Sequence, residues 1–384
     1  MIQIRDKHAC CGCTACASIC GRNAIEMKPD EEGFLYPVCN LSLCVNCHLC
    51  EQVCPVIARD RQRPDIEEGT VLAARNIDEN VQLQSSSGGV FTAVAEYVLS
   101  RKGVVYGAEY DEHWVVCHRR EETMEGALGF RGSKYVQSNL KGVYEDIRSL
   151  LRQGRLVLFS GTPCQVEGLK CFLRSPFDNL LTVDILCHGV PSPMIFADYV
   201  CFIKKYSIGN LQGIFMKDKT FGWGYQNLRL TFSNGTSQFN TSLSNLWNRI
   251  FYSRLAFRPS CYACRYTNYR RPGDITIGDF WGVEKSLPDF VDRKGISLIL
   301  INNLKGKTIW SNIEAHFKYL KSSKEHCLQQ CLSQPVLEPE NRPVFWKDYA
   351  TYGFSKIART YYDVSYKALF KGVLCQFVSL IRYK

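Results

Sequence analysis

The sequence lacks the usual fingerprints of nucleotide-dependent and radical chemistry. No GxGxxG run follows an expected strand, so a standard dinucleotide-binding motif is not indicated. Gly306, Lys307 and Thr308 match the end of a phosphate loop, but Ile301 stands where the first glycine of that loop belongs. No CxxxCxxC run is present, which argues against radical-SAM chemistry.

Segments that would direct the chain to a membrane or out of the cell are also lacking. Residues 1–8 contain neither the apolar stretch nor the small-residue cleavage site of a signal peptide. The uninterrupted apolar stretch of the tail is far shorter than the roughly 20 residues that span a bilayer. We therefore expect a cytoplasmic protein, because free thiols persist in that reducing compartment.

The formal net charge of +10 is unevenly distributed. Residues 341–384 carry eight basic and two acidic side chains, whereas residues 1–62 carry six basic and seven acidic ones. A basic excess is typical of nucleic-acid-binding proteins, but no RNA- or DNA-binding motif accompanies it here. We therefore expect no binding to nucleic acid.

Cysteine, in contrast, is abundant: the chain has 20, and eight of them form two runs of the same spacing. The first run is Cys10-x2-Cys13-x2-Cys16-x3-Cys20, and the second is Cys44-x2-Cys47-x2-Cys50-x3-Cys54. Three cysteines at two-residue separation bind one cubane cluster, and the fourth binds the cluster of the other run. The spacing predicts two [4Fe–4S] clusters, one held by Cys10, Cys13, Cys16 and Cys54 and the other by Cys44, Cys47, Cys50 and Cys20.

Zinc and disulfides are the alternatives for these cysteines. Tetrahedral zinc usually takes CxxC pairs rather than CxxCxxC runs, and disulfides are typical of small secreted proteins. Residues 1–60 resemble bacterial-type two-cluster ferredoxins, from which they depart at Gly21, where that family usually has proline. This departure leaves all eight ligands in place. We expect Cys11 and Cys39, which lie outside the pattern, only to pack nearby.

The length of 384 residues allows a second domain with a large core. We divide the chain into a ferredoxin module of residues 1–62, a polar linker of residues 63–70, a second domain of residues 71–320 and a C-terminal extension of residues 321–384. In the extension, apolar side chains recur at helical spacing from Tyr366 to Ile381. This pattern predicts a basic amphipathic helix that packs on its own domain or docks on a membrane surface or a partner.

Buried strands alternate with helices in the second domain. We predict strands over residues 71–75, 155–160, 180–186, 273–281 and 297–302, a hairpin over 103–119 and further strands within 211–245. Helices are predicted over residues 90–101, 142–154, 166–173, from about 193 onward, and over 305–320. Strand–helix–strand at this distance predicts a parallel pair. The fold class is therefore an α+β ferredoxin-like module followed by an α/β domain with a mixed sheet.

Four cysteines of the second domain form a candidate metal site. Cys164 and Cys187 each follow a predicted strand, and open α/β sheets bind ligands at that edge. Cys261 and Cys264 supply two more thiols at CxxC spacing. From the spacing alone, a third [4Fe–4S] cluster and a zinc site are equally indicated.

Two further segments are candidates for binding an anion. Residues 85–89 (SSSGG) precede a predicted helix, whose free N–H groups and dipole suit a phosphate. On composition alone, an ordinary N-cap is the better interpretation of this segment. Arg131, Ser133 and Lys134 can hold an anionic cofactor, and a solvated turn is the alternative for them.

Several segments resemble one family in chain order. The second domain resembles the beta subunit of coenzyme F420 hydrogenases and dehydrogenases at residues 85–89, 132–138, 161–165, 187–193, 261–264 and 273–282. The resemblance implies an FAD-binding domain with its own [4Fe–4S] cluster, bound by Cys164, Cys187, Cys261 and Cys264. It also implies flavin contacts by Ser85, Ser87, Gly88, Gly89, Ser133 and Lys134, to which we add Arg131.

The combination predicts an FAD- and 4Fe-4S-dependent oxidoreductase. Iron–sulfur clusters carry single electrons, whereas a flavin exchanges one or two. We therefore expect electrons to pass between a ferredoxin or a partner subunit and a two-electron acceptor. This acceptor is a small molecule that the sequence does not identify. His188 can donate a proton, although a structural role is favoured. The alternatives are a non-catalytic electron-transfer subunit and an accessory protein that docks through its basic tail.

Overall fold

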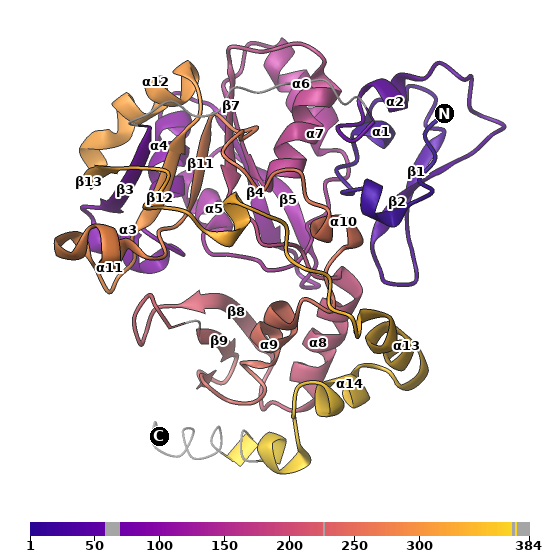
Figure 1. Ribbon diagram of the computed structural model, residues 1–384, viewed down its shortest axis with the longest axis vertical. Coiled ribbons are helices and arrows are strands. Elements are labelled where there is room, and N and C mark those ends of the chain that lie inside the picture. Colours follow the sequence, from indigo (N-terminus) through magenta and orange to yellow (C-terminus); the bar gives the residue numbers. More distant parts are fainter. Residues whose placement is uncertain (58–69, 226, 371–372, 375–384) are drawn as a thin grey trace.

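The computed structural model describes residues 1–57, 70–225, 227–370 and 373–374. Figure 1 shows three parts: an N-terminal module beside a large sheet, the large sheet with its helices, and a smaller layer of helices and strands below the sheet. Of the predicted linker, residues 63–69 lie outside the described residues, as do residues 375–384 of the predicted amphipathic helix.

The N-terminal module is built from two short helices and one hairpin. Its elements are η1 (Lys7–Ala9), α1 (Ala15–Ser18), β1 (Ile25–Pro29), β2 (Leu35–Cys39) and α2 (Leu49–Gln52). Strands β1 and β2 pair antiparallel. Both helices begin at the same place in the two cysteine runs, after residues of positive φ: Thr14 at 64° and His48 at 59°. The repeated spacing therefore produces the same local backbone twice.

The large sheet has eight strands in the order β13-β3-β12-β11-β7-β6-β4-β5. The strands are β3 (Val71–Asn76), β4 (Val104–Tyr110), β5 (Val116–Glu121), β6 (Val157–Gly161), β7 (Leu180–Ile185), β11 (Ile275–Asp279), β12 (Ser297–Ile301) and β13 (Phe317–Ser322). The four inner strands β4, β6, β7 and β11 are parallel, and the flanking pairs are antiparallel. The predicted mixed sheet, its parallel pair and its hairpin are confirmed.

Helices cover both faces of this sheet. They are α3 (Glu79–Gln84), α4 (Val90–Leu99), α5 (Met124–Ala127), η2 (Leu128–Phe130), α6 (Val143–Arg152), α7 (Pro163–Leu173), α11 (Val283–Ser286), η3 (Pro288–Phe290), α12 (Leu304–Ile313) and η4 (Glu314–His316). Leu158 of β6 packs in the cluster with α4 and α12, whereas its neighbours Val157 and Phe159 pack in the cluster with α6 and α7. Alternate side chains of one strand thus supply two cores, as the two-residue period of a strand requires.

The predicted helix over residues 305–320 is wrong in its second half. Helix α12 ends at Ile313, and Phe317 to Ser322 form the edge strand β13, which pairs antiparallel with β3. The unpaired edge of β3 provides backbone partners for this segment, and Phe317 packs in the core beside Trp310. Tertiary pairing therefore overrides the local helical pattern.

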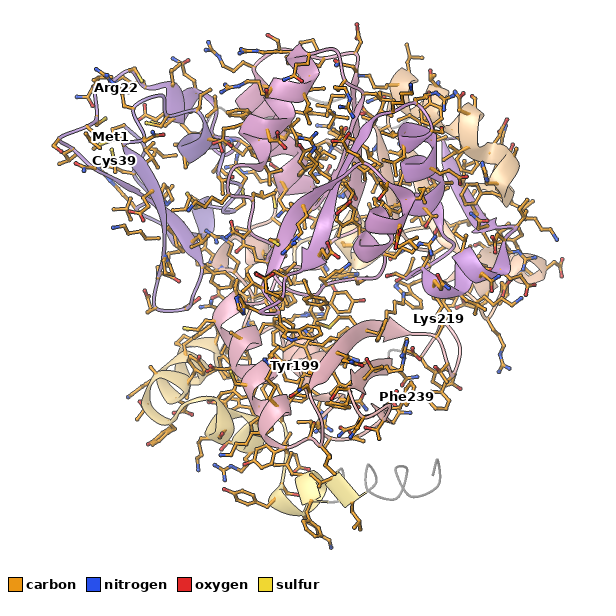
Figure 2. All side chains as sticks on the ribbon, turned by 180° about the vertical axis from the view of Figure 1, so that it is seen from behind. Met1, Arg22, Cys39, Tyr199, Lys219 and Phe239 are labelled. Carbon is orange, nitrogen blue, oxygen red and sulfur yellow. The ribbon has the colours of Figure 1, made fainter. Side chains whose placement is uncertain are left out.

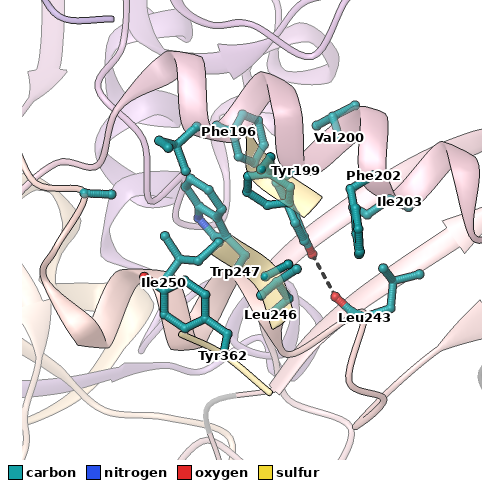
Figure 3. Packing of buried hydrophobic residues seen from close by; sticks show 14 of the residues in the cluster. Phe196, Tyr199, Val200, Phe202, Ile203, Leu243, Leu246, Trp247, Ile250 and Tyr362 are labelled. Atoms are coloured by element: carbon teal, nitrogen blue, oxygen red, sulfur yellow. Dashed lines mark hydrogen bonds between the residues drawn. The ribbon is translucent and has the colours of Figure 1, made fainter. Parts of the chain in front are cut away.

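The smaller layer has its own core. It contains α8 (Pro193–Lys205), β8 (Leu211–Asp218), β9 (Asn227–Phe232), β10 (Ser237–Gln238), α9 (Leu246–Ser253), α10 (Pro259–Tyr262), α13 (Arg342–Tyr352) and α14 (Phe354–Thr360). The short helix η5 (Gln330–Leu332) instead packs on the large sheet, where Leu332 joins the core formed by β3 and β12. Figure 3 shows Phe196 and Tyr199 of α8 packed on Trp247 of α9. The Tyr199 hydroxyl donates to the Leu243 carbonyl at 3.4 Å, which satisfies the buried phenol.

The C-terminal segment continues this layer. Residues 366–370 are helical, and Leu369 is buried in the same core while Phe370 and Leu374 are exposed. Within the described part of the chain, no helix has the length and apolar character needed to cross a membrane.

The N-terminal module is fixed to the rest of the chain by buried contacts. Helix α1 contacts α6 and α7, and η1 contacts α10. The Glu32 carboxylate accepts hydrogen bonds from both terminal nitrogens of Arg342, and its backbone carbonyl accepts one from Ser192 Oγ at 2.5 Å. Since the Glu32 and Arg342 side chains are only 10% and 8% exposed, the module is seated by an interior ion pair rather than by a surface contact.

Candidate metal centres and the adjoining cavity

The eight cysteines of the module surround two separate cavities. One cavity is lined by Cys10, Cys13, Cys16 and Cys54, and the other by Cys44, Cys47, Cys50 and Cys20. In each case the fourth cysteine comes from the other run, which is the exchange that the spacing predicts. We name them the inner cavity, which adjoins the second domain, and the outer cavity.

The two cavities differ in their exposure to solvent. Cys10, Cys13, Cys16 and Cys54 of the inner cavity are all buried, whereas Cys47 of the outer cavity is exposed. Around the outer cavity, Leu41, Leu43 and Val45 are 70%, 48% and 56% exposed. Figure 2 shows Met1, Arg22 and Cys39, which line the outer cavity, at the end of the module farthest from the large sheet. The outer cavity is therefore the one that a second protein can approach.

Backbone amides point at the sulfur atoms of the outer cavity. The N–H of Ile2 donates to Cys50 Sγ and the N–H of Ala24 donates to Cys20 Sγ, both at 3.3 Å. Such donors stabilise thiolate ligands of a cluster. At the inner cavity, burial raises the pKa of Cys16 and of Cys54, so these thiols need a bound cation to ionise.

The thiols surround cavities and do not converge on a point. Among residues 1–57, 70–225, 227–370 and 373–374, no three His, Cys, Asp or Glu side chains meet as the ligands of a single ion do. Cavities ringed by four thiols fit a cubane, which spreads its ligands over four iron atoms.

A third group of cysteines lies at the carboxyl edge of the large sheet. Strands β6 and β7 are parallel neighbours; Cys164 follows β6 at the start of α7, and Cys187 follows β7. Cys261, in α10, and Cys264, just after it, complete the set, and all four line one cavity of about 300 Å³. The topology thus brings together four residues that are far apart in the sequence.

Two more cysteines line this third cavity, and the sequence did not indicate them as part of it. Cys11 comes from the N-terminal module, and it lines both the inner cavity and the third cavity. Cys331 is buried in η5 at the other side. Cys11 therefore stands between the inner and the third cavity, a position that only the docking of the module creates.

Burial is the main cause of the raised pKa at three cysteines of the third group, Cys187, Cys261 and Cys264. Burial raises the pKa of Cys261 to about 12 and that of Cys264 to about 11, and neighbouring thiols add to the effect. The N–H of Val190 donates to Cys261 Sγ at 3.4 Å, and Thr162 Oγ1 lies 3.2 Å from Cys164 Sγ. Four half-buried thiols with such donors fit an iron–sulfur cluster, whose iron supplies the positive charge that ionisation requires.

A larger cavity of about 540 Å³ adjoins the third one. Of the residues predicted to hold a flavin, six line it: Ser85, Ser87, Gly89, Arg131, Ser133 and Lys134. Gly88 is not among the lining residues, because it packs on the sheet. A Cβ there would lie 2.2 Å from the Ala74 carbonyl oxygen and 2.8 Å from the Ser297 nitrogen. Gly88 thus allows the serine loop to sit against β3 and β12.

The hydrogen bonds of the serine loop distinguish its hydroxyls. Ser85 Oγ donates to the Val81 carbonyl and Ser87 Oγ to the Ile296 carbonyl, each at 2.7 Å. Ser86 Oγ instead lies 3.0 Å from Ser133 Oγ, and both residues line the cavity. Ser86, which the sequence indicated as part of residues 85–89 but not among the flavin contacts, is therefore a polar group of the cavity, and its partner is 47 residues away.

Arg131 and Lys134, which line this cavity, have only neutral hydrogen-bond partners among the described residues. Arg131 donates to Thr92 Oγ1 at 3.0 Å and to Gln84 Oε1 at 2.8 Å. Lys134 Nζ donates to the carbonyls of Gly129 and Arg131 at 2.7 and 2.8 Å. Burial lowers the pKa of Lys134 to about 7. Cations without carboxylate partners fit a cavity that receives an anionic group such as a pyrophosphate.

A neutral histidine is also held in the wall of this cavity. His118 Nε2 donates to the Ser160 carbonyl at 2.9 Å, which leaves Nδ1 to accept from the Ser138 hydroxyl at 3.0 Å. Gln165 Nε2 donates to Ser138 Oγ at 2.8 Å. Burial lowers the pKa of His118 to about 4 and keeps the ring neutral. The sequence did not indicate His118, because its partners come from three other segments.

The third cavity and the larger one share part of their lining. Cys187, His188, Gly189 and Val190 line both. Burial lowers the pKa of His188, and no hydrogen bond of its ring is present among the described residues. At the far side of the larger cavity, Lys217 pairs with Asp279 and lies 4.6 Å above the ring of Trp281. Both the candidate metal site and a polar, aromatic site therefore open onto one space.

Comparisons with known proteins agree with this geometry. Residues 9–58 match the model of the 4Fe-4S dicluster domain, and residues 154–325 match that of the C terminus of the coenzyme F420 hydrogenase/dehydrogenase beta subunit. These matches confirm both resemblances drawn from the sequence. No curated protein matches the chain.

Among solved structures, the chain is similar to one from the F420-reducing [NiFe] hydrogenase complex of Methanosarcina barkeri, studied by xenon derivatization. The identity is 19% and the TM-score 0.48, and the similarity covers 82% of this chain and 97% of that one.

Proposed function

The chain joins a 4Fe-4S dicluster domain to a C-terminal domain of the coenzyme F420 hydrogenase/dehydrogenase beta subunit family, and from this premise we propose an iron–sulfur flavoprotein oxidoreductase. It moves electrons between a ferredoxin or a partner subunit and a two-electron acceptor. Two clusters are held in the N-terminal module, and a third is held by Cys164, Cys187, Cys261 and Cys264. FAD occupies the cavity of about 540 Å³.

One observation carries this proposal: the candidate sites adjoin one another in a single order. Cys11 lines both the inner cavity, together with Cys13, and the third cavity, together with Cys164. Cys187 and His188 then line both the third cavity and the larger one. When bound, iron–sulfur clusters exchange single electrons and FAD exchanges one or two, so together they couple a one-electron donor to a two-electron substrate.

The residues of the larger cavity suit the binding of FAD. Arg131 and the free N–H groups at the start of α4 attract the pyrophosphate. Lys134, whose pKa of about 7 leaves it ready to gain a proton, compensates negative charge that develops nearby. His188, with no hydrogen bond of its own among the described residues, is placed to exchange a proton with a group in the cavity.

The donor protein approaches the outer cavity in this proposal. The observation behind this is that Cys47 is exposed there and that the apolar side chains of Leu41, Leu43 and Val45, close to it in sequence, are exposed as well. Transient electron-transfer partners use small surfaces of this kind. The proposed location of the protein is the cytoplasm.

Two other functions make different predictions. A non-catalytic electron-transfer subunit would bind clusters but no flavin. An accessory protein that docks through its tail would lose membrane or partner association when residues 361–384 are deleted, whereas the oxidoreductase would keep its cofactors and turnover.

The deciding experiment is anaerobic purification followed by quantitation of iron, sulfide, zinc and FAD. We expect about twelve iron atoms and one FAD per chain. A Cys187→Ser variant should lose about four of these iron atoms, while Cys201→Ser, an exposed cysteine outside the three cavities, serves as the control and should lose none. About eight iron atoms and no FAD in the wild type would contradict the oxidoreductase and favour the electron-transfer subunit.

A further inference from the structure

Arg258 is a buried cation with no carboxylate partner. Its side chain is fully buried, and among the described residues no ion pair involves it. The other deeply buried arginines are paired: Arg271 with Asp184 at 2.7 Å, and Arg342 with Glu32. An unpaired buried charge is costly unless an anion lies beside it.

The hydrogen bonds of the Arg258 guanidinium among the described residues go to the N-terminal module or to Gln137, which itself contacts that module. Nε donates to the Cys10 carbonyl at 2.7 Å, and one terminal nitrogen donates to the Leu35 carbonyl at 3.0 Å. The same nitrogen lies 3.6 Å from Cys10 Sγ, a proposed ligand at the inner cavity. The other terminal nitrogen donates to Gln137 Oε1 at 3.0 Å.

The cysteine run is shaped to admit this guanidinium. A Cβ at Gly12, whose φ is +67°, would lie 2.8 Å from a terminal nitrogen of Arg258 and 2.9 Å from its central carbon. On the other side, the guanidinium carbon lies 4.3 Å from the centroid of the Tyr36 ring. The charge is therefore clamped between an aromatic ring and the loop that ends at Cys13.

Among the described residues, no buried cation lines the outer cavity. Of the positive groups that line it, Arg22 is exposed, and the Met1 ammonium is neutralised by Glu51 at 2.6 Å. Solvent and a counter-charge screen these two groups, whereas Arg258 acts from the interior, where charges interact strongly.

We propose that Arg258 raises the reduction potential of the inner cluster above that of the outer one. A cluster with four thiolate ligands is anionic and becomes more so on reduction, so an adjacent buried cation and an N–H···S contact favour the reduced form. The inner cluster is then reduced before the outer one. Electrons that enter at the exposed end are thereby drawn toward the second domain.

The inference rests on the proposed ligation of a cluster by Cys10, and the experiment separates the two. The full-length protein is purified anaerobically and titrated with EPR detection, and the iron content is measured in the same samples. A Cys16→Ser variant removes or changes the inner cluster and so assigns its signal. If the wild type lacked the iron of the two module clusters, the ligation itself would be wrong.

The variants test the charge. We expect Arg258→Met to lower the equilibrium constant for reduction of the inner cluster at least tenfold. For a one-electron couple, a tenfold change is a fall of about 59 mV in the reduction potential. Arg258→Lys keeps the charge, so it should retain at least half of the difference in inner-cluster reduction potential between the wild type and Arg258→Met. Arg22→Met removes an exposed cation beside the outer cavity and serves as the matched control, with no shift expected at either cluster.

Methionine leaves the Cys10 and Leu35 carbonyls without a donor and can prevent assembly of the cluster. Arg258→Gln is therefore the second neutral variant, since its amide can still donate, and the same fall is expected. The proposal would be overturned if Arg258→Met or Arg258→Gln, with its iron bound, kept the wild-type reduction potential at the inner cluster. An equal fall in Arg258→Lys would also overturn it, because packing rather than charge would then be the cause.

Discussion

A glycine in helix α7 offers the sharpest test of how the N-terminal module is seated. A Cβ at Gly168 would lie 2.6 Å from Cys13 Cβ and 2.9 Å from Cys13 Sγ, about 1 Å closer than ordinary contact. In a helix where the new methyl group meets no neighbour, replacing Gly by Ala stabilises the folded protein by about 1 kcal/mol. Overpacking of this kind costs about 1–3 kcal/mol, so we expect Gly168→Ala to destabilise the docked state by about 0–2 kcal/mol.

The functional consequence should exceed this change in stability. Cys13 is a proposed ligand of the inner cluster, and it must move by about 1 Å to admit the new methyl group. A rigid cubane does not follow such a movement, so we expect loss of up to about four iron atoms per chain. Iron and sulfide quantitation of anaerobically purified protein measures the loss, and thermal unfolding measures the stability.

Gly21→Ala is the matched control for Gly168→Ala. Gly21 also adjoins a proposed ligand, Cys20, but a Cβ there meets nothing within 4 Å and its φ is not positive. The control should keep the full iron content. If Gly168→Ala also kept all of its iron and unfolded at or above the wild-type temperature, the contact between Cys13 and α7 would be refuted.

Three further predictions follow from single contacts. Arg342→Leu leaves the Glu32 carboxylate buried and unpaired and should cost about 3–5 kcal/mol, whereas the double variant Glu32→Leu/Arg342→Leu should cost less; equal losses in denaturant unfolding would contradict this. Leu43→Asp should slow reduction by the donor protein without changing turnover driven by a small-molecule reductant, and the exposed control Leu304→Asp should change neither rate; equal slowing would argue against the outer surface as the docking site. Burial lowers the pKa of Lys134 from 10.5 to about 7, so between these pH values the unfolded chain holds more protons and stability rises with pH. In flavin-free Lys134→Met, thermal unfolding should show a smaller rise of stability with pH than in the flavin-free wild type. If stability rose equally with pH in both proteins, the lowered pKa of Lys134 would be refuted.

The sequence was most informative where the chemistry is local. The eight cysteines of the module lie within 45 residues, and their spacing alone predicted the exchange of Cys20 and Cys54 between two cavities. The parallel pair of β6 and β7 was equally predictable, because two buried strands flank one short helix. That pairing was enough to place Cys164 and Cys187 at one edge.

Sequence reasoning failed where a partner lies far along the chain. Residues 317–320 carry a helical pattern but form an edge strand, because β3 offers an unpaired edge. His118 was missed, and Ser86 was indicated only as part of residues 85–89, since their partners, Ser160 and Ser133, come from other segments. No local pattern distinguishes such a residue from an ordinary polar one.

The sequence by itself therefore determined the kinds of site that the protein contains, since a cysteine run or a serine–glycine loop dictates its own backbone within a few residues. Only the tertiary structure decided how the sites are joined. Arg258 reaches Cys10 across 248 residues, and Arg342 reaches Glu32 across 310. Such contacts depend on the burial of charges that only the folded chain brings together, because the free energy of a buried ion is set by its surroundings and not by its neighbours in sequence.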